Sequence, residues 1–414
     1  MQNIKMAIRN LFRHKYRTFL TGATITIITF LLVFGLSVSE GISNGLIRNI
    51  ISLNTGHITV NSSSNAQSND TSIEPTNWDK QLLSNSDEIQ DEIGKINGVE
   101  YSTKRVKFTG ILTSKDKTSS GVFVGIEPGK EKDLLLDGIP VKEGTILPEE
   151  RNKKYIYISS TTAELYNLEI GEELTIVGQN TEYEQNSMKF EVCGIFKKSA
   201  WKEYYSYIYL SDAQKLASLG ERVTQIKVML SDRKEAVNIA NTINESLGAS
   251  YDIAARDWRT AGELLLGTVI IMEFSVFGLC FILFFLITSI LVNNISMAVF
   301  ERTNEIGMLT AMGMRSRGVF SLFMLETFFL SSIATMIGEI LGIVASLVLN
   351  RVGIPAFVEV LRLSFGGDYT YPELKMSYII VSFVVIVSMS LIVTIIPTKS
   401  AVMLKPVEAV NHVQ

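Results

Sequence analysis

Cysteine and histidine are scarce in this sequence of 414 residues. The two cysteines, Cys193 and Cys280, lie in a polar region and in a long apolar run, so no disulfide framework is implied. The three histidines, His14, His57 and His412, are scattered over different regions. This spacing leaves no plausible metal cluster, and we predict no metal ligands.

The short motifs of ATP-hydrolysing and other hydrolytic enzymes are also missing. A phosphate-binding loop needs Ser or Thr after Gly-Lys, whereas Gly94-Lys95 and Gly129-Lys130 are followed by Ile and Glu. There is no His-Glu-x-x-His, and the one G-x-S-x-G match, at residues 41–45, follows an apolar run instead of a strand. We therefore predict no catalytic residues, no cofactor on this chain and no ATP hydrolysis by that route.

Charged residues are nearly absent from four long apolar runs. Only 19% of all residues are charged and 47% are hydrophobic, which is ordinary for a whole chain, so membrane character must be concentrated in segments. A helix needs roughly 20 apolar residues to cross the hydrocarbon core. Four runs reach that length and are predicted to span a membrane, namely residues 18–39, 264–300, 319–350 and 376–396.

The charges outside these runs are distributed unevenly. Residues 40–263 hold 33 acidic and 25 basic side chains, a net charge of −8, and the rest of the chain sums to +4. The positive-inside rule assigns the basic segments 1–17, 301–318 and 397–414 to the cytoplasm. The sequence thus predicts a four-helix transmembrane domain with both termini inside. A mixed α/β extracytoplasmic domain at 40–263 is inserted between spans 1 and 2, and 351–375 is a short external loop.

The start of the chain has two further features. Residues 1–17 predict an amphipathic helix on the membrane surface, with a solvated basic tail as the alternative. Residues 18–39 have some features of a cleavable signal peptide, including the triplet Ser37-Val38-Ser39. The apolar run exceeds the ~7 to 15 residues of a signal peptide, which favours an uncleaved anchor.

Alternating and helical patterns follow one another in the external domain. The first span is expected to continue outward through residues 41–50, and residues 61–70 to form a mobile polar loop. We predict helices at 78–96, 213–219 and 232–247, the last with apolar residues at Ala236, Ile239, Ala240 and Ile243. Strands are predicted at 57–60, 106–112, 121–126, 155–159, 173–177, 189–196 and 223–230.

Three acidic residues lie in or near the spans: Glu273, Glu326 and Glu339. Intramembrane carboxylates are costly, so each is a functional candidate, and an inward-facing Glu bonded to a neighbouring span is the alternative. Gly338 and Gly342 form a G-x-x-x-G that permits close helix contact. The second run exceeds the bilayer requirement by more than ten residues, which predicts a rod projecting from the membrane.

The cytoplasmic loop at residues 301–318 is short, carries charges of both signs and presents apolar side chains in water. Apolar groups in this position need a partner. A helix that docks a soluble protein and a turn that folds back on the bilayer both fit the pattern.

Three separated segments resemble the MacB-type permeases of ABC transporters, a family that includes the lipoprotein-releasing LolC and LolE proteins and FtsX. They are AIRNLFRHKYRTFLT at the start, ERTNEIGMLTAMGMRSRGVFSLFMLET around the loop, and IPTKSAVMLKPVEAV at the end. The resemblance implies mechanotransmission, in which ATP-driven closure of two ATPases is relayed through long helices to external domains. It also implies that the ATPase docks on Glu301, Arg302, Glu305, Ile306, Met308 and Leu309.

The same resemblance implies the partners and the location. ATP and Mg²⁺ bind a separate cytoplasmic ATPase, and a second permease copy or a paralogue completes the pair. A lipoprotein substrate, a periplasmic carrier and membrane lipid are further expected partners, and nucleic acid is not. The bacterial inner membrane and LolC/LolE-like lipoprotein release are favoured. Export of another substrate and FtsX-like activation of an external enzyme stay open.

Overall fold

The computed structural model describes residues 15–65, 81–115, 117–179, 185–197, 204–263, 314–357 and 369–402, together with scattered positions between 266 and 297. The chain divides into two compact units. We call the first the helix-bundle unit; it comprises Met1–Ser43, Ile271–Pro355 and Tyr369–Gln414. We call the second the sheet unit; it comprises Asn44–Ile270 and Ala356–Asp368.

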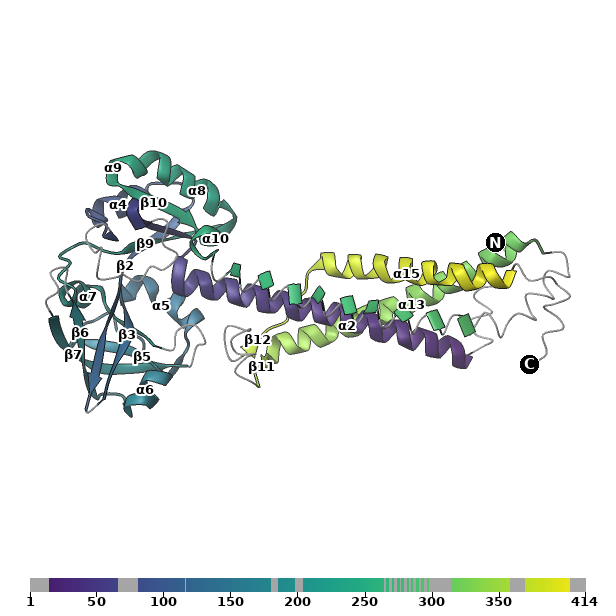
Figure 1. The fold of residues 1–414 in the computed structure, drawn as a ribbon, viewed down its shortest axis with the longest axis horizontal. Helices are drawn as coiled ribbons and strands as arrows, with labels where there is room; N and C mark the ends of the chain where they lie inside the picture. The colour runs from purple at the N-terminus through teal and green to yellow at the C-terminus, as the bar shows by residue number, and fades with distance from the viewer. Residues whose placement is uncertain are drawn as a thin grey trace. The chain divides into compact units, whose positions relative to one another are not determined.

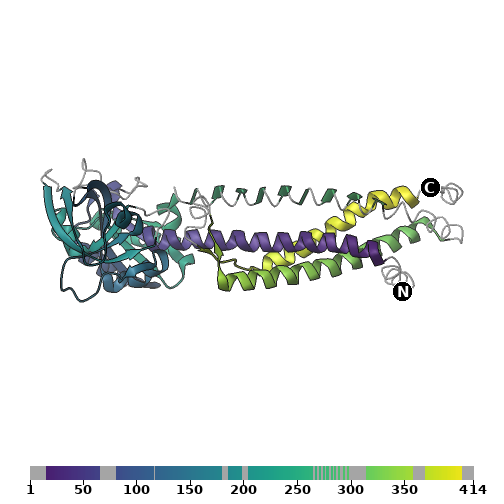
Figure 2. The same cartoon turned by 90° about the horizontal axis from the view of Figure 1, so that it is seen from below.

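Three long apolar helices form the described part of the helix-bundle unit. They are α2 (Lys15–Asn49), α13 (Ser316–Val352) and α15 (Met376–Val402), and they run side by side in Figures 1 and 2. Each is long and apolar enough to cross a membrane. Their shared core includes Ile25, Val319, Phe323, Ala334 and Ile386. A two-stranded ribbon, β11 (Ile354–Pro355) with β12 (Tyr369–Thr370), lies between α13 and α15 in the chain.

Several predicted segments lie outside the described residues. They include the amphipathic lead up to residue 14, the docking loop from 301 to 313 and the tail from 403 onward. In the predicted second span, residues 264–300, only scattered positions are described, and these are helical. Three apolar helices are therefore observed, and the fourth span stays a prediction.

A ten-stranded sheet organises the sheet unit (Figure 1). Its order is β10-β1-β9-β2-β3-β8-β5-β7-β4, and β6 pairs with both β2 and β7. The pairs β3·β8 and β5·β7 are parallel, and the other pairs are antiparallel. The strands are β1 (Ile58–Ser62), β2 (Val99–Ser114), β3 (Lys117–Ile126), β4 (Val141–Gly144), β5 (Tyr155–Ser159), β6 (Glu173–Gln179), β7 (Gln185–Phe196), β8 (Tyr205–Tyr209), β9 (Gln225–Leu230) and β10 (Ile253–Asp257).

Short helices cover this sheet and supply its core. α8 (Ala236–Ile243) buries Ala236, Ile239, Ala240 and Ile243, the apolar face that its helical periodicity predicted. The other helices are η1 (Ile50–Thr55), η2 (Ser63–Asn65), α4 (Ser86–Gly94), α5 (Pro128–Gly138), α6 (Ser160–Tyr166), α7 (Leu210–Leu216), η4 (Arg233–Glu235), η5 (Asn244–Gly248), α9 (Ala249–Tyr251) and α10 (Trp258–Ala261).

One predicted helix is interrupted, and one helix continues past the predicted end of a span. The helix expected at 78–96 is interrupted at residues 82–85, because Leu83 forms a β-bridge with Val223 and Asn85 takes a left-handed conformation with φ 57°, and α4 begins only after them. Helix α15 continues through Pro397 to Val402, past residue 396, where the last span was predicted to end. An apolar helix packed against neighbours tolerates an internal proline better than a solvated one.

Candidate functional site

The residues predicted to dock an ATPase lie outside the described part of the chain. This applies to Glu301, Arg302, Glu305, Ile306, Met308 and Leu309, and also to Glu273. Their proposed roles therefore stay predictions.

Gly338 and Gly342 lie on the face of α13 that contacts α2. A Cβ on Gly338 would meet the carbonyl oxygen of Thr26 at 2.5 Å and the Cβ of Thr29 at 2.7 Å. A Cβ on Gly342 would meet Val33 at 3.0 Å. The hydroxyl of Thr26 donates to the carbonyl of Ala334 at 3.0 Å, so the close approach is accompanied by an interhelical hydrogen bond. The G-x-x-x-G therefore packs two helices of the same chain.

The acidic residues of α13 lie in different surroundings. Glu339 is buried and accepts a hydrogen bond from the hydroxyl of Ser382 on α15 at 3.0 Å. Glu326 is only partly buried. On the same helix pair, Thr394 donates to the hydroxyl of Thr327 at 3.4 Å. Glu339 is thus a hydrogen-bond acceptor that joins α13 to α15 inside the bundle.

Glu40 on α2 forms a polar contact that the sequence did not predict. Its carboxylate accepts from the ammonium of Lys375 at 2.5 Å and from the hydroxyl of Tyr378 at 2.6 Å. The amide of Glu373 donates to the carbonyl of Ser37 at 2.9 Å. The chain entering α15 is therefore tied to α2.

Gly41 explains the close approach at this point. A Cβ there would lie 2.0 Å from the carbonyl oxygen of Tyr371, so only glycine lets the two backbones meet. The G-x-S-x-G match at residues 41–45 lies inside helix α2. It lacks the strand-to-helix turn that a nucleophile needs.

Beyond Asn49, α2 continues as the π-helix η1, which belongs to the sheet unit. The amide of Gly56 donates to the carbonyl of Ile51 at 2.8 Å, five residues back. Gly56 ends the helix with φ 65°, and a Cβ would lie 3.2 Å from the carbonyl oxygen of Val228. A positive φ and this close strand favour glycine at the helix end.

Two buried basic side chains from the sheet bind the last carbonyls of η1. Arg105 on β2 donates from Nη1 to the carbonyl of Leu53 at 2.7 Å, and Lys227 on β9 donates from Nζ to the carbonyl of Ser52 at 3.2 Å. Glu131 on α5 accepts from Nε of Arg105 at 2.8 Å and also binds Nη2. We call Arg105, Lys227 and Glu131 the helix-end clamp.

Register explains why the helix-end clamp comes together. Thr103 lies opposite Lys227 in the β2·β9 pair, and Arg105 follows two residues later on the same face of β2. Basic groups at the carboxyl end of a helix satisfy its free carbonyls and interact favourably with its dipole. The clamp therefore joins two strands and a helix to the end of η1.

Burial decides the electrostatics of the helix-end clamp, since Arg105 is 1% exposed and Glu131 and Lys227 are 0% exposed. Desolvation opposes the charge of Arg105, but the attraction and hydrogen bonds of Glu131 outweigh it, and the pKa of Arg105 is raised. Burial, followed by the neighbouring Arg105, holds the pKa of Lys227 well below its usual value. Arg105 and Glu131 form a paired charge, whereas Lys227 is driven toward the neutral amine.

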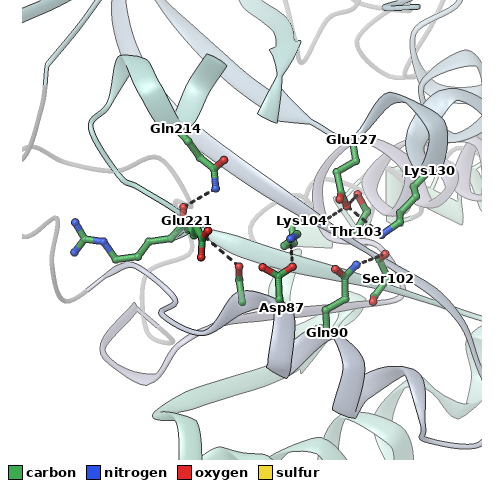
Figure 3. A network of polar contacts seen from close by, with 11 residues as sticks. Asp87, Gln90, Ser102, Thr103, Lys104, Glu127, Lys130, Gln214 and Glu221 are labelled. Carbon is green, nitrogen blue, oxygen red and sulfur yellow. Dashed lines mark hydrogen bonds and ion pairs between the residues drawn. The ribbon is translucent and has the colours of Figure 1, made fainter. Parts of the chain in front are cut away.

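Further polar contacts continue from the clamp along β2. Thr103 donates to Glu131 at 3.1 Å and to Glu127 at 3.3 Å. Figure 3 shows Glu127 beside Thr103, and the ammonium of Lys104 bound to the carboxylate of Asp87 on α4 at 2.5 Å. Strand β2 is thus tied to both α4 and α5 by side-chain bonds.

Sequence reasoning missed the helix-end clamp, although a signal was present. Lys227 interrupts the apolar strand QIKVML, in which every residue of β9 is buried. A lysine in a fully buried strand requires a specific partner. The partner itself, a carbonyl of residue 52, could not be found without the fold.

Two family models match the chain. Residues 18–245 match the MacB-like periplasmic core domain, and residues 277–406 match the FtsX-like permease C-terminal domain. Homologous ABC permeases are membrane proteins, in keeping with the three apolar helices.

Relatives are similar over most of the chain. The macrolide export ATP-binding/permease protein MacB of Campylobacter fetus is 22% identical over 99% of this chain, which spans 60% of that protein. The lipoprotein-releasing system transmembrane protein LolC of Neisseria meningitidis is 21% identical over 76% of this chain and 79% of its own length. The periplasmic region of MacB from Actinobacillus actinomycetemcomitans is 16% identical. The match covers 52% of this chain and 94% of the MacB structure, and its TM-score of 0.38 is too low to establish a fold by itself.

Proposed function

This chain belongs to the MacB/FtsX-type family of ABC permeases, and we propose on that basis that it is a permease subunit driven by a separate cytoplasmic ATPase. ATP and Mg²⁺ bind that ATPase. The permease pairs with a second copy or a paralogue in the bacterial inner membrane, with residues 264–300 as a fourth span. Residues 40–263 then lie outside the cytoplasm.

The continuous helix formed by α2 and η1 is the observation that supports this function best. The helix that could cross a membrane here runs from Thr18 to Thr55 and contains 38 residues. At roughly 1.5 Å per residue this is about 57 Å, whereas the hydrocarbon core is only ~30 Å thick. The part of the helix beyond the length that the hydrocarbon core needs ends at the helix-end clamp, where side chains from two strands of the sheet unit bind it. A helix of this length is suited to relay ATP-driven motion from the membrane to an external domain.

Lipoprotein release from the inner membrane is the proposed transport reaction. The similarity to LolC supports it, because the chain spans 79% of that relative's length against 60% of the length of MacB, which is named an ATP-binding/permease protein. Depletion of this chain is expected to trap lipoproteins in the inner membrane. Unchanged lipoprotein sorting would favour export of another substrate or activation of an external enzyme.

The dependence on an ATPase is tested by co-purification. Glu305→Arg combined with Ile306→Asp is expected to abolish recovery of the ATPase with the tagged permease. The double change reverses one acidic charge of the docking helix and removes an apolar anchor. Glu164→Arg with Leu165→Asp makes the same change on exposed residues of α6 and is expected to leave recovery intact. Full recovery with the first pair would refute the docking assignment.

A further inference from the structure

The end of η1 is held by buried polar side chains that packing alone does not require. A helix end can be satisfied by a glycine cap, by water or by apolar contacts around the last turn. Here a guanidinium and a lysine nitrogen reach the carbonyls of residues 53 and 52 from two neighbouring strands. Burying such groups costs free energy unless each is well bonded, so their presence at this position needs an explanation.

An apolar contact resists separation but gives little resistance to sliding, because it has no preferred direction. Hydrogen bonds to two consecutive carbonyls act differently. They fix both the rotation and the axial position of the helix end relative to β2 and β9, since a shift of one residue breaks both bonds. The bidentate contact between Arg105 and Glu131 fixes the guanidinium in turn.

From this geometry we propose that Arg105 and Lys227 are positioning residues, which make the sheet follow rotation and axial movement of the helix end. Glu131 orients Arg105 and balances its charge. The movement itself rests on the proposed function, but the hold on the helix end does not. Strands β2 and β9 lie next to each other in the sheet, so movement of η1 reaches the sheet through both.

The test compares two paired substitutions in the full-length permease. Arg105→Met with Glu131→Leu removes a buried ion pair from the clamp without leaving either charge alone. Lys227→Met removes the hydrogen bond to the carbonyl of Ser52 and keeps an unbranched apolar side chain of similar length. Arg151→Met with Asp212→Leu is the matched control. It removes an ion pair of the same sheet unit, at 2.5 Å and with Asp212 buried, that binds α7 instead of η1.

The first measurement is amide hydrogen exchange without nucleotide. Loss of a hydrogen bond is expected to speed exchange in residues 50–57 by about tenfold. In the clamp variants, strands β5 and β7 should keep their wild-type exchange rates. In the control variant, residues 50–57 should also exchange at the wild-type rate. Unchanged exchange in residues 50–57 in both clamp variants would overturn the proposal, whether or not the chain is a permease.

The second measurement adds the ATPase with and without a non-hydrolysable ATP analogue. In the wild type and the control, the analogue is expected to change exchange in α2 and also in β2 and β9. In the clamp variants the change in α2 should persist, while that in β2 and β9 is lost. Retention in β2 and β9 would overturn the positioning role. A wild type that responds nowhere would instead count against the proposed function, and the measurement without nucleotide would still decide the clamp.

Discussion

Where α2 packs against α13 in the helix-bundle unit, it is held by small residues and a neutral hydrogen bond, whereas its η1 continuation in the sheet unit is held by a buried ion pair and a buried lysine. Gly338 lets α13 approach Thr26 and Thr29 of α2, and the Thr26 hydroxyl bonds to a backbone carbonyl. At the other end, Arg105 and Lys227 bind carbonyls of η1. The same helix is thus secured by close packing where it meets α13 and by buried basic side chains at its η1 end, and Glu40 adds an ion pair with Lys375 within the helix-bundle unit.

This difference follows from what each surrounding can stabilise. Between apolar helices, association depends on close packing, because lipid is as apolar as the side chains it touches. In the sheet unit, paired charges are tolerated because hydrogen bonds from the strands compensate for their desolvation. We therefore expect the bundle to be sensitive to side-chain size and the clamp to be sensitive to charge balance.

The largest effect is expected when one charge of the clamp is left alone. Glu131→Leu leaves the guanidinium of Arg105 buried without its carboxylate, which should cost about 3–5 kcal/mol of local stability. Adding Arg105→Met should restore most of this loss. Hydrogen exchange of β2 amides measures both variants, and an equally severe double variant would show that shape also governs the clamp.

A smaller effect is expected from added volume in the bundle. Gly338→Ala introduces a Cβ 2.5 Å from the carbonyl oxygen of Thr26 and should cost about 1–3 kcal/mol. Gly278→Ala is the control, because a Cβ there would meet no atom of the described residues within 4 Å. Thermal unfolding in detergent compares the two. Equal midpoints would contradict close packing between α2 and α13.

A still smaller effect is expected from one neutral hydrogen bond. Ser382→Ala removes the donor to Glu339 and should cost about 0.6 kcal/mol, the typical value for a bond between membrane helices. Ser346→Ala removes a buried hydroxyl that has no hydrogen-bond partner in the described part of α13 and its neighbours, and should be neutral or slightly stabilising. If both variants lose the same stability, the Glu339 bond contributes nothing of its own.

The smallest effect concerns His57, which comes after Gly56 at the end of η1 and is only half-buried. Its Nδ1 accepts from the amide of Leu230 at 2.9 Å, which requires a neutral ring. Burial, followed by the charge of Arg233, lowers the pKa of His57, although Glu100 and Asp232 oppose this. The contribution to stability is therefore present above the ordinary pKa of about 6.5 and is lost as the pH falls through the lowered folded value.

His57→Asn tests this pH dependence, because the amide oxygen can replace Nδ1 as an acceptor but does not titrate. Thermal unfolding of the wild type should move to lower temperature between neutral and mildly acidic pH. The variant should lose less over the same range. Parallel curves would exclude His57 as the titrating group.

The long elements were predictable because their signals are local. Apolar length alone identified the helices α2, α13 and α15, and alternation identified β5 at residues 155–159. The buried face of α8 followed from its helical period. These features depend on neighbours within a few turns, so the sequence contains them directly.

The clamp and the Glu40 contact were not predictable because their partners are distant in sequence. Arg105 bonds to a carbonyl 52 residues away, and the Tyr378 hydroxyl bonds to Glu40 across 338 residues. Strand β8 was also missed, although it pairs in parallel with β3 in the middle of the sheet. Register and strand order create these contacts, and neither is visible in a local pattern.

On the proposed function, α2 passes ATP-driven movement from the bundle to the sheet. The most direct measurement is hydrogen exchange of the wild-type permease bound to its ATPase, with and without a non-hydrolysable ATP analogue, followed along residues 15–65. A nucleotide-dependent change is expected on both sides of Ser43, including residues 50–57. A change that stops within the helix-bundle unit and leaves residues 50–57 unaltered would contradict it.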